Sequence, residues 1–169
     1  MPSPPDSRPE PPSIAGERET LVGFLEWQRA TLLWKCSGVA AEDLVRRAVP
    51  TSNLSLIGIV RHMMLVEWSW FEKVFSGVSV PPPISMDADR DADFNDLDPA
   101  RRDEDLARFD AQCDISRRVI TGGELDQLAA SGRTPTTLRW ILVHMIEEYA
   151  RHNGHADLLR EAIDGAVGE

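Results

Sequence analysis

The segment TPTTLRWILVHMIEEYARHNGHADLLREAIDG, residues 134–165, predicts one long helix. Thr134 is a good N-cap, Pro135 suits the first helical position, and Gly165 favours a left-handed end. Apolar residues recur on one face at the helical period of about 100° per residue, and they are Leu138, Ile141, Met145, Ala156, Leu159 and Ile163. This pattern is typical of a helix that packs one side against a core.

Two polar residues interrupt this apolar face. Glu148 and His152 are spaced i and i+4 and fall inside or at the edge of the face, so we expect their side chains to point into the interior. His144 and His155 lie on one flank, and Arg151 lies further toward solvent. Either the Glu–His pair is hydrogen-bonded on the helix surface, or it is half of a metal site that a neighbouring helix completes. This helix alone leaves both interpretations open.

Apolar periodicity predicts three further helices and no strand, so the fold class is all-α. The expected architecture is a four-helix bundle with a long crossover between its second and third helices. A short helical turn is expected within residues 38–50 and a short helical piece within residues 122–133. The four long helices are predicted at residues 17–36, 52–77, 101–121 and 134–165.

The second predicted helix is apolar over more than half of its circumference, and His62 lies within this run. A lone histidine in such a run is usually a hydrogen-bonded core residue, but a facing helix that presents Glu148 and His152 makes His62 the natural third ligand. Glu67 either orients a ligand from behind or forms a salt bridge at the core edge. Arg29, in the first helix, is expected to be solvated, with substrate binding in a bundle cavity as the alternative.

Residues 78–99, VSVPPPISMDADRDADFNDLDP, break the helical pattern with three consecutive prolines and a series of aspartates. The aspartates resemble a calcium-binding loop only superficially, because Ala92 stands at the sixth position, where such a loop needs glycine. We therefore expect a solvated acidic connection between the two ends of the bundle.

Length, charge and composition restrict the function further. The 169 residues suit one domain, expected at residues 17–169, preceded by a disordered tail at residues 1–16 that holds six of the twelve prolines. A net charge of −10 argues against nucleic acid and anionic lipid as partners. No apolar run is long enough to span a membrane, so a cytoplasmic protein is expected. Cys36 and Cys113 have no metal-type spacing and are interpreted as buried thiols.

Three segments together resemble the DinB/YfiT-like superfamily of helical-bundle metalloenzymes, and the resemblance covers residue 17 to the C-terminus. They are GIVRHMMLVEWSWF (residues 58–71), DADFNDLD (residues 91–98) and TLRWILVHMIEEYARHNGHADLLREAIDG (residues 137–165). The last segment is similar to the signature of the mycothiol-dependent branch, which includes maleylpyruvate isomerase and mycothiol S-transferases.

The resemblance implies a set of metal ligands. The wider superfamily usually has three histidines, whereas a His, Glu, His set is typical of the mycothiol-dependent branch. Carried over to this chain, the ligands would be His62, Glu148 and His152, with no protein nucleophile beyond the metal site. The residues assigned to the rim or to a supporting role are Glu67, His144, Arg151 and His155. The implied cofactor is a divalent ion, Zn²⁺ first and Ni²⁺ or Fe²⁺ as alternatives, with mycothiol or a similar thiol as co-substrate.

Three functions remain open from the sequence. The first is a metal-dependent thiol S-transferase or thiol-dependent isomerase that acts on a small electrophile, and the resemblance adds a homodimer. The second is a metal hydrolase that activates water with the same ion. The third is a non-catalytic bundle that binds a metal or a small molecule. A ferritin-like di-iron enzyme is disfavoured because only one helix presents an inward Glu and His.

Overall fold

The computed structural model describes residues 8–168 and has an all-α fold, as predicted. Its long helices are α1 (Glu17–Cys36), α3 (Leu56–Glu67), α5 (Arg102–Gly122) and α6 (Leu138–Asp164), and α3 continues directly into the π-helix η1 (Trp68–Phe75). Shorter elements are α2 (Ala41–Leu44), α4 (Ala92–Asn95) and the 3₁₀-helix η2 (Pro99–Arg101). Within the described residues, β pairing is confined to one isolated bridge between Leu128 and Thr137.

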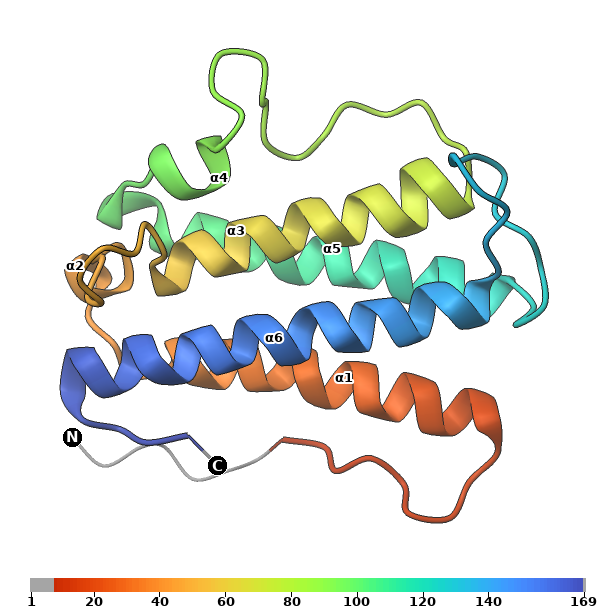
Figure 1. Cartoon of the computed structure of the whole chain (residues 1–169), viewed down its shortest axis with the longest axis horizontal. Helices are drawn as coiled ribbons and strands as arrows, with labels where there is room; N and C mark the ends of the chain where they lie inside the picture. The colour runs from red at the N-terminus through yellow and green to blue at the C-terminus, as the bar shows by residue number, and fades with distance from the viewer. Residues whose placement is uncertain (1–7, 169) are drawn as a thin grey trace.

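The long helices form two side-by-side pairs, α1 with α6 and α3 with α5 (Figure 1). α3 also contacts α6 and α1, so the apolar faces of the four long helices meet in one core. Residues with no solvent exposure in this core include Leu32, Ile59, Met63, Phe71, Ile141 and Met145. Within residues 8–168, none of the helices combines the length and the apolar character needed to cross a bilayer.

α6 ends where predicted but begins later. Gly165 adopts a left-handed conformation with φ of 78° and terminates the helix. The predicted start at Thr134 is wrong, because the side chain of Thr137 caps the helix by accepting a hydrogen bond from the Trp140 amide at 3.3 Å. Residues 136 and 137 are instead engaged with residues 128 and 129, so the predicted short helical piece within residues 122–133 is also wrong, apart from Gly122, the last residue of α5.

The crossover between η1 and α5 runs along α3 (Figure 1). The prediction of a solvated acidic connection is wrong for part of this segment. Ala92 and Asp93, in α4, are buried. The buried Arg61 of α3 donates hydrogen bonds to the carbonyls of Asp93 at 3.3 Å and Ala92 at 3.2 Å. Its guanidinium also pairs with Asp105 of α5 at 2.9 Å. Arg61 therefore fixes α4 against the bundle, which a pattern of surface aspartates does not reveal.

A buried ion pair joins α1 to α3. Arg29 is 2% exposed and donates to both carboxylate oxygens of the fully buried Glu67, at 2.8 and 2.7 Å. The hydroxyl of Tyr149 in α6 donates to the same carboxylate at 2.7 Å. The prediction of a solvated Arg29 is thus wrong, because the guanidinium compensates a carboxylate that faces it from another helix. Of the two interpretations of Glu67, the structure shows the salt bridge, but it lies inside the core and not at its edge.

Residues 8–16 belong to the segment that the sequence analysis expected to be a disordered tail. In the structure they lie along α1. The Arg8 guanidinium stacks over the rings of Trp27 and Trp34, at 4.2 and 4.6 Å from their centroids. Gly23 permits the close approach of Pro12, since a Cβ at position 23 would lie 2.6 Å from the proline ring. The rest of the predicted tail, residues 1–7, lies outside the described residues.

Candidate metal centre

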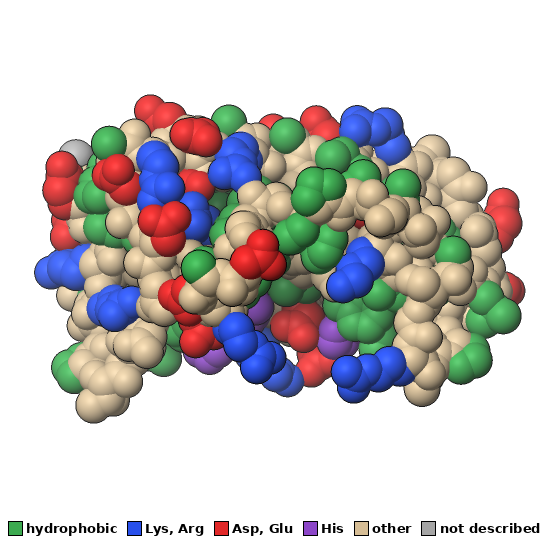
Figure 2. Space-filling model, turned by 90° about the horizontal axis from the view of Figure 1, so that it is seen from above, with side chains coloured by type: hydrophobic (Ala, Val, Ile, Leu, Met, Phe, Trp, Pro, Cys, Tyr) green, Lys and Arg blue, Asp and Glu red, His purple; other side chains and the backbone are tan. Residues whose placement is uncertain are grey.

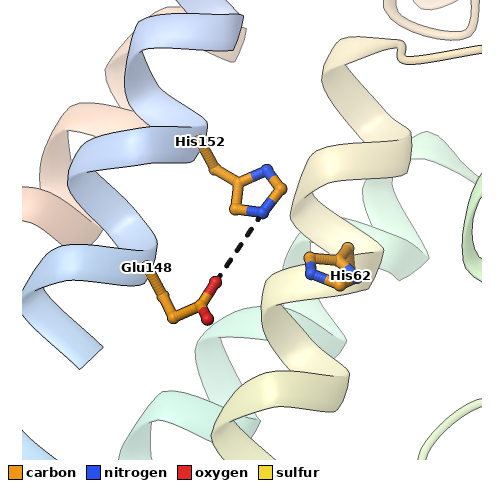
Figure 3. A group of neighbouring side chains, drawn as sticks. All are labelled: His62, Glu148 and His152. Atoms are coloured by element: carbon orange, nitrogen blue, oxygen red, sulfur yellow. Dashed lines mark ion pairs between the residues drawn. The ribbon is translucent and has the colours of Figure 1, made fainter. Parts of the chain in front are cut away.

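His62 on α3 and Glu148 and His152 on α6 face one another across the line where the two helices meet (Figure 3). One potential ligand atom from each residue lies within 4.8 Å of the others. The centroids of the two imidazole rings are 4.8 Å apart, and Glu148 Oε2 lies 3.9 Å from His152 Nε2. The structure therefore brings together the three side chains that the sequence analysis singled out.

These side chains lie at the edge of the core. Their exposed fractions are 28% for His62, 24% for Glu148 and 13% for His152. The expectation that Glu148 and His152 point into the interior is therefore corrected, because Tyr149 and Asn153 occupy the buried positions next to them. In the space-filling view, histidine and acidic side chains gather in a hollow of the face that carries the crossover, with hydrophobic side chains beside them (Figure 2). The cluster is thus partly shielded and partly open to solvent.

Asp93 and Phe94 of the crossover orient the His62 ring. Its Nδ1 lies 2.9 Å from Asp93 Oδ2, and its ring stacks on Phe94 at 5.2 Å. When Nδ1–H donates to this buried carboxylate, Nε2 carries the lone pair, and this tautomer is the usual one for a histidine metal ligand. Sequence reasoning missed Asp93 because it treated the aspartates of the crossover as a solvated series. The only signal was the place of DADFNDLD among the segments of the family resemblance.

His152 is held in its neutral form. Burial lowers its pKa to about 4, and the nearby His62, His155 and Arg151 act in the same direction. Its Nδ1 is buried and has no hydrogen-bond partner among the described residues. A neutral imidazole that is not engaged in a structural hydrogen bond is suited to bind a cation near neutral pH.

This pKa predicts how the stability of the metal-free protein depends on pH. Between pH 6.5 and 4 the unfolded chain protonates residue 152 and the folded chain does not, so the free energy of unfolding falls as the pH falls. We expect His152 to contribute about 1 to 2 kcal/mol to this loss. Urea unfolding of chelator-treated wild type and His152→Gln at pH 7, 5.5 and 4.5 measures it. The variant should lose less stability over this range, and equal losses would contradict the prediction.

The four supporting residues predicted from the sequence divide into two groups. His144 and His155 lie beside the cluster, with His144 Nε2 at 3.4 Å from Glu148 Oε1 and the His155 ring edge-on to His152 at 5.3 Å. Arg151 is exposed and pairs with Glu147 at 2.7 Å. Glu67 is bound to Arg29 in the core. The structure therefore places two of the four next to the candidate centre.

Comparison of the chain with known proteins gives a family match. The sequence model of the mycothiol-S-transferase family matches residues 20–165, which include α3, α6 and all three clustered residues. Among curated proteins and among solved structures, no match to the chain was found.

Proposed function

Because the chain belongs to the mycothiol-S-transferase family, we propose that it transfers a low-molecular-weight thiol such as mycothiol to a small electrophile, with a divalent metal ion bound by His62, Glu148 and His152. The observation that carries this proposal is the convergence of these three partly exposed side chains, from two helices, in a hollow of the surface.

The donor set fits such an ion. Two imidazoles and one carboxylate are a common set for Zn²⁺ and also suit Ni²⁺ or Fe²⁺. Ligand atoms around tetrahedral zinc lie about 3.3 Å apart, so side-chain rotations of small amplitude bring the present separations to a bonding arrangement. Three protein ligands leave a position for a thiol or for water.

The bound ion would favour the thiolate form of a thiol co-substrate, which is the nucleophilic form. The chain's own cysteines do not suit this role. Burial raises the pKa of the Cys36 thiol to about 12, and Cys113 is also buried, with its pKa raised mainly by desolvation and also by Glu67. Both thiols are therefore protonated and enclosed near neutral pH, which supports an external thiol as the attacking group.

The test is metal content together with thiol dependence. The protein is purified without added metal and examined by elemental analysis, then assayed with an electrophile in the presence and absence of mycothiol. We expect about one transition-metal ion per chain and turnover that requires the thiol. Turnover of an ester without thiol would favour the hydrolase instead. A chain that cannot be loaded to one ion would overturn the proposal and favour a non-catalytic bundle.

Two further parts of the proposal concern location and assembly. We propose a cytoplasmic location, supported by two buried cysteines that are not joined in a disulfide. A homodimer is proposed on the family resemblance, and light scattering of the purified protein tests it.

Replacing Asp93 by alanine should weaken metal binding by about 10- to 100-fold, because His62 loses the carboxylate that fixes its ring and tautomer. Competition with a chromogenic chelator measures the affinity. Asp87→Ala is the control, since Asp87 lies exposed on the same crossover and its hydrogen bonds among the described residues are with the nearby Ser85. Equal affinities of the two variants would exclude this role for Asp93.

A further inference from the structure

Three aromatic rings pack together beside the candidate metal centre. Trp140 and His144 of α6 are nearly parallel, with centroids 5.0 Å apart and an interplanar angle of 15°. Trp70 of η1 meets both, at 5.4 Å from Trp140 and 4.7 Å from His144. We call these three residues the aromatic platform.

The platform is continuous with the metal cluster. Trp140, His144, Glu148 and His152 follow one another at intervals of four residues, so they line one face of α6. His144 joins the two groups directly, through the 3.4 Å contact of its Nε2 with Glu148 Oε1. A rise of 1.5 Å per residue places the platform about 6 to 12 Å along the helix from Glu148.

The π-helical form of η1 helps to place Trp70 on this face. In a regular α-helix, Trp70 would lie about 80° around the axis from His62, eight residues earlier. The wider turn of a π-helix reduces this offset, and such turns occur often at functional sites. Trp70 therefore faces α6 on the same side as His62, as its contacts with Trp140 and His144 show.

Part of the platform is open to solvent. Trp140 is 50% exposed although it packs against two other aromatic rings. Its ring is held in place by stacking on His144, and about half of the residue remains accessible. Planar groups bind accessible aromatic rings by offset or edge-on stacking.

From this placement we infer that Trp70, Trp140 and His144 form a subsite for an aryl group of the electrophile, while its reactive carbon lies at the metal cluster. The inference rests on the proposed function and specifies its substrate class. The favoured substrates would be electrophiles in which an aromatic ring lies a few bonds from the carbon that the thiol attacks.

Two vinyl sulfones with the same reactive group test this subsite. In each, the thiol sulfur forms a bond to the terminal vinyl carbon, the C=C π bond opens, and the carbon next to the sulfone takes up the proton that the thiol loses. The metal-loaded protein is assayed with mycothiol and with phenyl vinyl sulfone or methyl vinyl sulfone. We expect wild type to prefer the phenyl compound by about 10-fold in kcat/KM, relative to the uncatalysed reactions.

In Trp140→Ala this preference should fall to near unity, through a higher KM for the phenyl compound, with the methyl compound unaffected. Trp34→Ala, on α1, is the matched control and should keep the preference. Equal use of the two sulfones by wild type, or a Trp140→Ala variant with unchanged preference, would overturn the inference and leave the transferase proposal intact.

A binding measurement tests the aryl subsite independently of the proposed thiol transfer. Phenyl methyl sulfone and dimethyl sulfone are unreactive, and their binding to wild type and Trp140→Ala is followed by calorimetry. Selective binding of the phenyl compound that is lost in Trp140→Ala supports the subsite even if no thiol transfer is found. Equal binding of the two compounds to wild type would overturn it whatever the activity.

Discussion

Replacing Glu148 by glutamine is expected to reduce metal content from about one ion per chain to below about 0.1 and thiol transfer by at least about 100-fold. The substitution keeps the volume and helical preference of the side chain but removes the charged donor, since an amide oxygen is a far weaker ligand for zinc-like ions. Glu148 is partly exposed and is not part of the buried ion pair, so the fold should be retained. Elemental analysis, circular dichroism and the thiol-transfer assay measure the three properties.

Glu147→Gln is the matched control, one residue earlier on the same helix. Glu147 is 58% exposed, pairs with Arg151 and lies 3.7 Å from His144 Nδ1. It is not one of the three clustered residues, so we expect its charge not to affect metal content. Retention of the ion in both variants would show that Glu148 is not a ligand. Loss of the ion in both variants would indicate a general disturbance of α6. It would remove the support for Glu148 as a specific ligand.

Replacing Arg29 by methionine is expected to lower the free energy of unfolding by about 3 to 5 kcal/mol. The methionine fills much of the space of the arginine stem, but it leaves the carboxylate of Glu67 buried without its cation. The cost arises from this uncompensated charge. Urea denaturation of the variant and of wild type at pH 7 measures the difference.

Arg117→Met controls for the loss of an arginine. Arg117 binds Glu26, which Arg29 also contacts, but its side chain is 38% exposed. Solvent screens such a pair, so we expect a loss of no more than about 1 kcal/mol. A double variant, Arg29→Met with Glu67→Gln, should recover part of the stability because it removes the unpaired charge. Similar losses in the two single arginine variants would contradict the role given to burial.

The elements of this fold follow closely from local patterns in the sequence. α1 begins and ends as predicted at residues 17 and 36, and Ser55 and Gly165 mark helix ends through capping and a left-handed turn. What local patterns do not contain is the partner of each polar residue. Arg29 looks like a surface residue until α3 brings Glu67 against it, and Asp93 looks solvated until Arg61 binds the backbone of its turn.

At the candidate site, too, local sequence patterns identify single residues but not the residues that contact them. Spacing on α6 and the family resemblance identified Glu148, His152 and His62, and the structure brings these side chains together. Their role as ligands stays a prediction. The orienting carboxylate and the aromatic platform depend on contacts between elements, and the π-helical turn that places Trp70 has no local sequence signal that distinguishes it from an α-helix.

The pairing of α1 with α6 affects the order in which the chain can fold during its synthesis. Among the long helices, α1 leaves the ribosome first and its main partner leaves last, with residues 37–137 between them. During that interval the apolar side of α1 that α6 will cover is available to chaperones and to other nascent chains. His62 is likewise synthesised before Glu148 and His152, so the cluster is incomplete during this interval. The docking of α6 therefore closes the core and completes the cluster of His62, Glu148 and His152 in one step.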